Sequence, residues 1–171
     1  MFNIRQAYEQ DLHHIADMDI KSFDEPWPTE LWTQLLLLDR HQYRVATSYG
    51  TPVGFVVFAP MTLTNRADYA REDPAKSVVI GKLAVKPAYR RRYIGSMLLQ
   101  SVGAYCRDFD FTRVETLIPE SLCVPGPRRV SGWMTKMGFR ADRVVKNTFY
   151  NYGEIEDGYE FYYDLRTKTN E

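Results

Sequence analysis

The sequence has few cysteines, no long hydrophobic run and no excess of charge of either sign. Only Cys106 and Cys123 occur among 171 residues, which excludes a disulfide framework and favours a reducing compartment, the cytoplasm. The longest apolar stretch, Val53 to Met61, is far shorter than the ~20 residues that cross a bilayer. The N-terminus also carries no signal-peptide pattern. We therefore expect a cytoplasmic protein that does not bind membranes.

Charge and histidine content exclude two further classes of partner. Lys plus Arg balance Asp plus Glu, 22 against 22, so the chain lacks the broad basic face that nucleic acids require. His13, His14 and His41 have no ligand-like spacing with cysteines or carboxylates, and we expect no metal site. The length fits one domain with a sizeable core. We assign residues 1–166 to a single domain and 167–171 to a frayed tail.

Hydrophobic periodicity predicts helices and strands in mixed order. The apolar run Val78 to Val85 is typical of a strand covered on both faces. A predicted helix and a second predicted strand, which ends at residue 118, follow it, and a strand, helix and strand in this order predict a right-handed parallel crossover. Two polar segments, Thr62 to Lys76 and Thr148 to Tyr152, are predicted as loops. In chain order the predicted elements are strand 2–6, helix 12–20, helix 28–38, strands 43–49, 53–60 and 78–85, helix 94–107, strand 112–118, helix 130–137, and strands 139–146 and 159–165.

A strand, a tight turn and a helix start follow one another between Val78 and Leu99, and together they make a natural anion site. The first N–H groups of a helix have no partner inside it, and the helix dipole adds partial positive charge there. Gly95 lets the backbone approach a bulky ligand, and Arg90 to Arg92 add charge that pairs with phosphate. The pattern favours a pyrophosphate-bearing cofactor over a merely solvated turn before an ordinary helix.

The segment Arg90-Arg91-Arg92-Tyr93-Ile94-Gly95 resembles the (Gln/Arg)-x-x-Gly-x-(Gly/Ala) motif with which GNAT acyltransferases bind acetyl-CoA. The lead-in Leu83 to Arg90 and the order of elements along nearly the full chain are also similar to this family. One position departs, because Tyr93 stands where the first motif glycine is usual and its side chain has to point away from the phosphates. The resemblance implies an α/β (α+β) fold with a mixed, mostly antiparallel sheet of about seven strands and about four helices.

The resemblance also implies acetyl-CoA as the cofactor and a set of residues that hold it. The pantetheine arm is expected along Leu83, Ala84 and Val85, where a backbone N–H polarises the thioester carbonyl. Arg128 and Arg129 are expected either to contact the phosphates of CoA or to form a solvated helix start. The pyrophosphate is expected on the turn and the first helical residues, Arg90, Arg91, Arg92, Tyr93, Ile94, Gly95 and Ser96.

Two short segments resemble one branch of the family, the ribosomal-protein and related protein N-terminal acetyltransferases. Ser22 to Pro28 is similar to their Phe-x-x-Pro-Trp element, and Lys146 to Tyr150 to their Arg/Lys-Asn-x-Tyr-Tyr substrate loop. Ordinary packing also explains either segment. The resemblance implies that Trp27, Phe149 and Tyr150 contact the acceptor, which is a primary amine of a protein N-terminus or of a small molecule.

Catalytic residues are less well defined, because the usual positions for the base and the acid hold Leu117 and Met134. Glu115, on the same predicted strand, and Glu120, just past its end, are the candidate bases, and we prefer Glu120. Tyr150 is a candidate proton donor to the thiolate. These departures leave two alternatives open. One is a protein of this fold that binds CoA or a partner protein without catalysis, and the other is a different nucleotide-binding α/β fold. Neither the acceptor nor the oligomeric state follows from the sequence.

Overall fold

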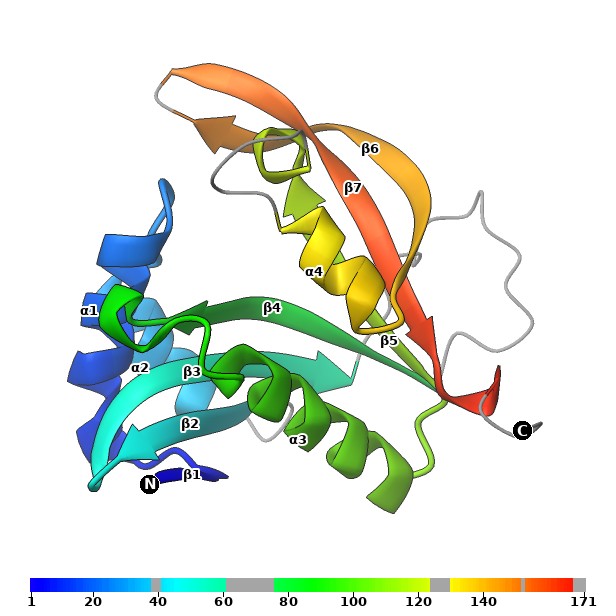
Figure 1. Cartoon of the computed structure of the whole chain (residues 1–171). Helices are drawn as coiled ribbons and strands as arrows, with labels where there is room; N and C mark the ends of the chain where they lie inside the picture. Colours follow the sequence, from blue (N-terminus) through cyan, green and yellow to red (C-terminus); the bar gives the residue numbers. More distant parts are fainter. Residues whose placement is uncertain (38–40, 61–75, 124–129, 152, 168–171) are drawn as a thin grey trace. The chain divides into compact units, whose positions relative to one another are not determined.

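The computed structural model describes residues 1–37, 41–60, 76–123, 130–151 and 153–167 (Figure 1). The chain forms two compact units. The first comprises Met1–Ala59 and Ile80–Tyr105, and the second comprises Pro60–Val79 and Cys106–Glu171. The assignment of residues 1–166 to one domain stays a prediction.

Seven strands follow the order β1-β2-β3-β4-β5-β7-β6, with β4 and β5 parallel. The described residues contain four α-helices. This confirms the predicted mixed sheet and its parallel crossover from the fourth to the fifth strand. The elements are β1 (Phe2–Gln6), α1 (Leu12–Ser22), α2 (Thr29–Leu37), β2 (Gln42–Ser48), β3 (Thr51–Pro60), β4 (Ser77–Val85), α3 (Ile94–Asp108), β5 (Arg113–Pro119), α4 (Ser131–Lys136), β6 (Arg140–Asn151) and β7 (Glu154–Asp164).

The first unit has a layer of helix on each face of its strands (Figure 1). On β3, Phe55 and Val57 point to one face and pack with the buried side chains of α1 and α2. Alternate residues point to the other face, where a Cβ on Gly54 would lie 3.3 Å from side-chain atoms of Ile94 and Leu98 in α3. Because side chains alternate along a strand, these contacts place α3 opposite α1 and α2.

Strands β2 and β3 pair antiparallel as a hairpin, and its turn is Tyr49-Gly50. Both residues have positive φ, 49° and 84°, as a two-residue hairpin turn requires. Helix α1 runs two residues beyond its predicted end, to Ser22. Within this helix Ile20 is exposed and Met18 is buried.

The second unit contains β5, β6, β7 and α4. Strand β7 lies between β5 and β6 and pairs antiparallel with both. The prediction of a loop over Thr148 to Tyr152 is wrong for the described residues, because β6 continues to Asn151 and pairs with Glu154–Glu156. Its register shifts between Val145 and Phe149, and Asn147 has a φ of 54°. This bulge interrupts the alternating pattern on which the sequence prediction relied. Strand β7 accordingly begins at Glu154 rather than Tyr159.

Several sequence predictions fall on residues that are not described. The predicted loop 62–76 lies outside the described residues except for Lys76, and so does the predicted tail except for Thr167. Arg128 and Arg129 also lie outside them. Among the helices of the described residues, none is both long enough and apolar enough to cross a bilayer.

Candidate functional site

The turn between β4 and α3 is held by hydrogen bonds to three backbone carbonyls. The N–H of Lys86 donates to the carbonyl of Val53 at 2.8 Å, and the N–H of Arg90 donates to the carbonyl of Pro87 at 3.3 Å. The Nε of Arg90 donates to the carbonyl of Val85 at 2.9 Å. These three bonds fix the point at which the chain leaves β4 and turns toward the helix.

Two residues of this turn, Arg91 and Tyr93, have left-handed backbone conformations, with φ of 60° and 63°. Left-handed and right-handed residues in succession turn neighbouring N–H groups toward one concave side, which forms an anion-binding nest. Tyr93 therefore adopts the conformation that a glycine would supply at this position. Its side chain is 81% exposed, so the ring leaves the turn for solvent. A tyrosine in place of the motif glycine is thus compatible with a tight turn.

The backbone N–H groups of this turn and of the helix start that follows have no partner among the described residues. Within the described chain, no N–H from Arg91 through Ser96 donates a hydrogen bond to another residue, and the first helical bond is Met97 N–H to the carbonyl of Tyr93 at 2.9 Å. Buried N–H groups are almost always paired. Arg91 to Tyr93 are exposed, while Ile94 is buried and Gly95 and Ser96 are half-buried, so the unpaired N–H groups lie at the surface end of the helix, where they can bind a ligand. Six free donors at the start of a fifteen-residue helix fit a pyrophosphate.

The three arginines of the turn differ in their roles. Arg90 uses its Nε to hold the backbone of β4, and the Arg92 guanidinium lies 5.6 Å from the centre of the Tyr89 ring. Both side chains, like that of Arg91, are exposed. The arginines thus add positive charge beside the free N–H groups, while Arg90 also stabilises the turn.

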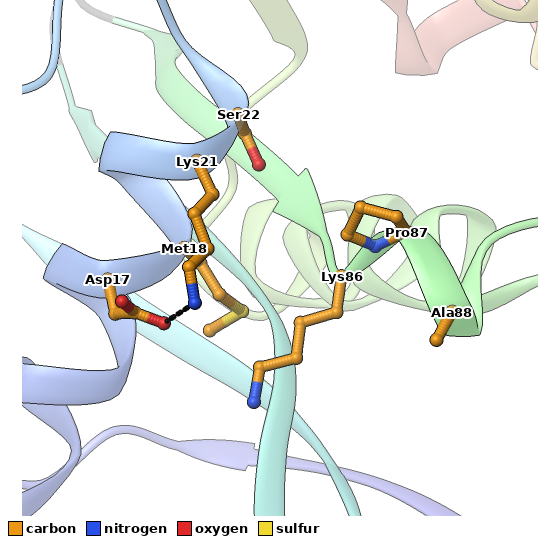
Figure 2. A pocket seen from close by; sticks show the side chains of 7 residues that line it. All are labelled: Asp17, Met18, Lys21, Ser22, Lys86, Pro87 and Ala88. Carbon is orange, nitrogen blue, oxygen red and sulfur yellow. Dashed lines mark hydrogen bonds and ion pairs between the residues drawn. The ribbon is translucent and has the colours of Figure 1, made fainter.

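The end of β4 and the end of α1 enclose a cavity of about 340 Å³. Figure 2 shows Met18, Pro87 and Ala88 as its apolar lining and Lys86 reaching past it. At its rim, the Lys21 ammonium is paired with Asp17 at 2.9 Å. Two of its lining residues are sequence neighbours of expected site residues. Lys86 follows Val85, where the pantetheine arm is expected, and Ser22 precedes Phe23, which begins the segment between α1 and α2. Of the expected pantetheine residues, Ala84 is buried, while Leu83 and Val85 are half-buried.

The segment between α1 and α2, from Phe23 to Pro28, is tied to two charged residues that the sequence analysis missed. Asp19 and Lys82 form a buried ion pair of 2.5 Å, and the Lys82 ammonium lies 4.8 Å from the ring centre of Trp27. Burial lowers the pKa of Lys82, and the bond to Asp19 opposes that shift. A signal was present in the sequence, because Asp19 falls on the apolar face of a helix and Lys82 interrupts an apolar strand.

Glu115 and Glu120, the two candidate bases, have different surroundings in the second unit. Glu115 is 0% exposed, and its carboxylate accepts a hydrogen bond of 3.0 Å from Arg113. Arg113 also pairs with Asp142 at 3.1 Å and lies over the ring of Tyr162. Glu115 thus belongs to a buried ion-pair network.

Glu120 lies in a short 3-10 turn directly after β5 and is partly exposed. No hydrogen bond or ion pair to its carboxylate is found within the described part of the chain. The neighbouring Ser121 is instead held by Glu156, to which its N–H donates at 2.9 Å and its hydroxyl at 3.1 Å. Glu120 is thus a partly exposed carboxylate on a well-fixed turn.

Phe149 and Leu117 lie on the same part of the second unit. A Cβ on Gly158 would lie 3.0 Å from atoms of both side chains, so both cover that glycine. Tyr150 pairs through its backbone with Ile155 in the β6–β7 hairpin, and its side chain lies outside the described residues. Met134, at the usual position of the acid, is buried in α4 and has no proton to donate.

Cysteine and metal chemistry receive no support from the described residues. Burial raises the pKa of Cys123 to about 11 and that of Cys106 to about 12, so both thiols stay protonated near neutral pH. In the ranges that the structure describes, no three His, Cys, Asp or Glu side chains gather as metal ligands would.

A scan against protein families gives a match to the acetyltransferase (GNAT) family over residues 11–122, which is more than half of the sequence and includes the turn with the free N–H groups. The chain belongs to the GNAT family. Membership confirms the resemblance found in the sequence and assigns this GNAT protein to the acetyltransferases, which transfer an acetyl group to an amine.

Three relatives of this GNAT protein carry more detailed names. A Bacillus subtilis protein, described provisionally as a [ribosomal protein bS18]-alanine N-acetyltransferase, is 22% identical over 156 residues, or 88% of this chain and 89% of its own. The crystal structure of the Escherichia coli ribosomal-protein-S18-alanine N-acetyltransferase has a TM-score of 0.77 at 15% identity, covering 96% and 94% of the two chains. Arabidopsis thaliana NAA60, solved with acetyl-CoA, has a TM-score of 0.83 at 19% identity, covering 97% and 99%. At these identities the two structures show a shared fold.

Proposed function

We propose that this protein transfers the acetyl group of acetyl-CoA to the α-amino group of a protein N-terminus. The observation that carries the proposal is the row of free N–H groups from Arg91 to Ser96. The names of the relatives support this acceptor, since two of them refer to an alanine N-acetyltransferase of a ribosomal protein. The scarcity of cysteine supports a site of action in the cytoplasm.

In this proposal the turn between β4 and α3 holds the pyrophosphate. The N–H groups of residues 91–96 donate to its oxygens, and Arg91 and Arg92 supply charge, because charge-assisted bonds are the stronger ones. Leu83 to Val85 hold the pantetheine arm through their backbone. When bound, acetyl-CoA supplies a thioester whose carbonyl carbon accepts a nucleophile.

The acceptor amine has to lose a proton during the reaction. A free α-amino group has a pKa near 8, so roughly one tenth of it is neutral at pH 7, whereas a lysine with a pKa near 10.4 is almost entirely charged. An α-amine therefore needs less help from a base than a lysine does. The amine nitrogen forms a bond to the acetyl carbon, the carbon–sulfur bond breaks, and the CoA sulfur leaves with the electron pair.

We assign the proton from the amine to Glu120. Its carboxylate is partly exposed and without a hydrogen-bonding partner among the described residues, whereas that of Glu115 is engaged by Arg113. A base must be able to reach its proton, which favours Glu120. The thiolate takes a proton from Tyr150 or from water, because Met134 has none to give.

Trp27, Phe149 and Tyr150 are the residues that we expect to contact the acceptor, as the family resemblance implies. Trp27 is half-buried and held by Asp19, and Phe149 is half-buried in β6.

The test is an acetylation assay with purified protein, acetyl-CoA and a mixed panel of acceptors, read by mass spectrometry. The panel holds peptides with free N-termini, the same peptides blocked at the N-terminus but carrying a lysine, polyamines and aminoglycosides. The proposal predicts a gain of one acetyl group on free N-termini. Acetylation confined to polyamines or aminoglycosides would identify a small-molecule enzyme instead. If the protein binds acetyl-CoA but no acceptor in the panel is acetylated, it is a protein that binds CoA without catalysis.

A further inference from the structure

Asp19 and Lys82 form a buried ion pair in the first unit, and each of them makes further hydrogen bonds. The Lys82 side chain is 8% exposed and that of Asp19 is 0% exposed. The Lys82 ammonium donates to Asp19 at 2.5 Å and to the backbone carbonyl of Glu25 at 2.9 Å. Two charges that are so well buried lose much of their hydration. Their mutual attraction offsets this desolvation cost only when further hydrogen bonds satisfy the remaining donors and acceptors.

Most of the pair's further partners belong to the segment between α1 and α2, and one, Trp32, belongs to α2. The second oxygen of Asp19 accepts from the backbone N–H of Trp27 at 2.7 Å and from Nε1 of Trp32 at 3.2 Å. The Lys82 ammonium lies 4.8 Å from the ring centres of both Phe23 and Trp27, a distance at which a cation is attracted to an aromatic face. The segment is thus held at its beginning, its middle and its end.

Apart from the ion pair, the segment is held by side-chain packing: Phe23 and Trp27 pack against the buried core, and the Trp27 ring centre lies 4.7 Å from that of Trp32. Residues 23–28 form neither helix nor strand, so no ladder of backbone bonds supports them. Replacing a buried ion pair by apolar residues of similar volume is often neutral for stability or favourable to it, so net stability does not explain the pair. What the ion pair supplies is a fixed position for the Phe23 and Trp27 rings, because its hydrogen bonds are directional and apolar contacts are not.

We propose that Asp19 and Lys82 are positioning residues that hold the Phe23–Trp27 segment in the geometry that receives the acceptor amine. This inference rests on the proposed function, in which Trp27 contacts the acceptor. The pair touches neither acceptor nor cofactor in this account and acts through the two rings. Removing it should therefore weaken use of the acceptor and leave binding of acetyl-CoA unchanged.

The test compares steady-state kinetics of Lys82→Met, Asp19→Asn and the double variant Lys82→Met/Asp19→Leu with the wild-type chain. We expect kcat/KM for the acceptor to fall by about ten-fold or more, mainly through KM, since small misplacements of binding groups have effects of this size or larger. The Kd of acetyl-CoA should stay within two-fold. The double variant removes both charges together but leaves the Trp27 N–H and Trp32 Nε1 without their acceptor, so its thermal midpoint should fall. Its KM is therefore measured at a temperature at which circular dichroism shows the variant to be folded.

Two further variants separate positioning from folding. Gly81→Ala places a methyl group 3.2 Å from the edge of the Trp27 ring without touching the ion pair, and it should raise the acceptor KM while the protein stays folded. Asp11→Asn is the matched control, because Asp11 is a second buried carboxylate paired with an arginine, Arg5, at 2.7 Å. It should lower stability without changing KM.

The outcomes distinguish this inference from the function on which it rests. If the wild-type chain transfers no acetyl group to any acceptor, the proposed function is overturned, and the inference with it. An active wild type whose acceptor KM is unchanged in the double variant and in Gly81→Ala would overturn the inference alone. So would an equal loss of acetyl-CoA affinity in these variants, since that would indicate general disruption of the unit.

Discussion

Replacing Tyr93 by glycine should stabilise the protein and preserve the cofactor turn. Tyr93 has a φ of 63°, and an L-residue in this region costs about 1–2 kcal/mol. Glycine removes that cost but adds about 0.5–1 kcal/mol through the greater freedom of the unfolded chain. Because the tyrosine ring is 81% exposed, little apolar burial is lost. The free energy of unfolding should rise by roughly 0.5–1 kcal/mol, measured by urea denaturation.

Valine at the same position should have the opposite effect. A β-branched side chain is a pronounced outlier at positive φ, so Tyr93→Val should shift the backbone toward negative φ and disperse the N–H groups of the nest. A loss of about 1.4 kcal/mol in binding corresponds to a ten-fold weaker Kd, and we expect at least that change for acetyl-CoA in calorimetric titration. Tyr93→Gly should bind acetyl-CoA at least as tightly as the wild type.

Tyr49 offers a matched control. It has a φ of 49° and is 91% exposed in the β2–β3 hairpin, where no cofactor is expected. Tyr49→Gly should give a similar gain in stability, and Tyr49→Val a similar loss, with no change in acetyl-CoA affinity. The reasoning is refuted if Tyr93→Gly destabilises the protein by more than about 1 kcal/mol, or if Tyr93→Val binds acetyl-CoA as the wild type does.

Three further predictions concern the second unit and the start of α1. Glu120→Gln should lower kcat by about 10²–10⁴-fold with stability unchanged, whereas Glu115→Gln should cost about 3 kcal/mol in urea unfolding; an undiminished kcat in Glu120→Gln removes it as the base. Gly138→Ala should destabilise by at least about 1–2 kcal/mol, because φ is 93° and the new Cβ would lie 2.7 Å from the Tyr163 ring; thermal unfolding measures this. The hydrogen bond from Arg5 lowers the pKa of Asp11 in the folded protein. The Arg5–Asp11 pair therefore contributes its full stability above about pH 3.9, the ordinary pKa of an aspartate, and this stability is lost as the pH falls through the folded-state pKa. Asp11→Asn should therefore reduce stability at pH 7 by about 1–3 kcal/mol and far less at pH 2, and an equal loss at both pH values contradicts the ion pair.

The order of elements could be predicted from the sequence because most of them have a clean hydrophobic period. The strand and helix on either side of the cofactor turn are examples, with Ile94 and Leu98 buried as their spacing predicted. The second half of β6 could not be predicted in the same way. Its bulge at Asn147 shifts the register, so apolar residues no longer alternate with polar ones, and only pairing with β7 makes the segment a strand.

The candidate site was predicted by residue type but not by geometry. Nothing in Arg91 or Tyr93 as residue types favours a left-handed backbone, so the nest could not be read from local preference. The pair of Asp19 and Lys82 joins residues 63 positions apart, and its existence depends on how α1 packs on β4. The buried environment of Glu115 likewise depends on Arg113 and on partners from distant strands.

The most direct test of the central claim compares two acetyl donors in calorimetric titrations. Acetyl-CoA carries the pyrophosphate, while S-acetylpantetheine carries the same thioester and arm without it. If free N–H groups from Arg91 to Ser96 bind the pyrophosphate, acetyl-CoA should bind about 100-fold more tightly or better, since hydrogen bonds to charged groups contribute about 1.5–3 kcal/mol each. Equal affinities for the two donors, or no binding of acetyl-CoA at high micromolar concentration, would contradict the account.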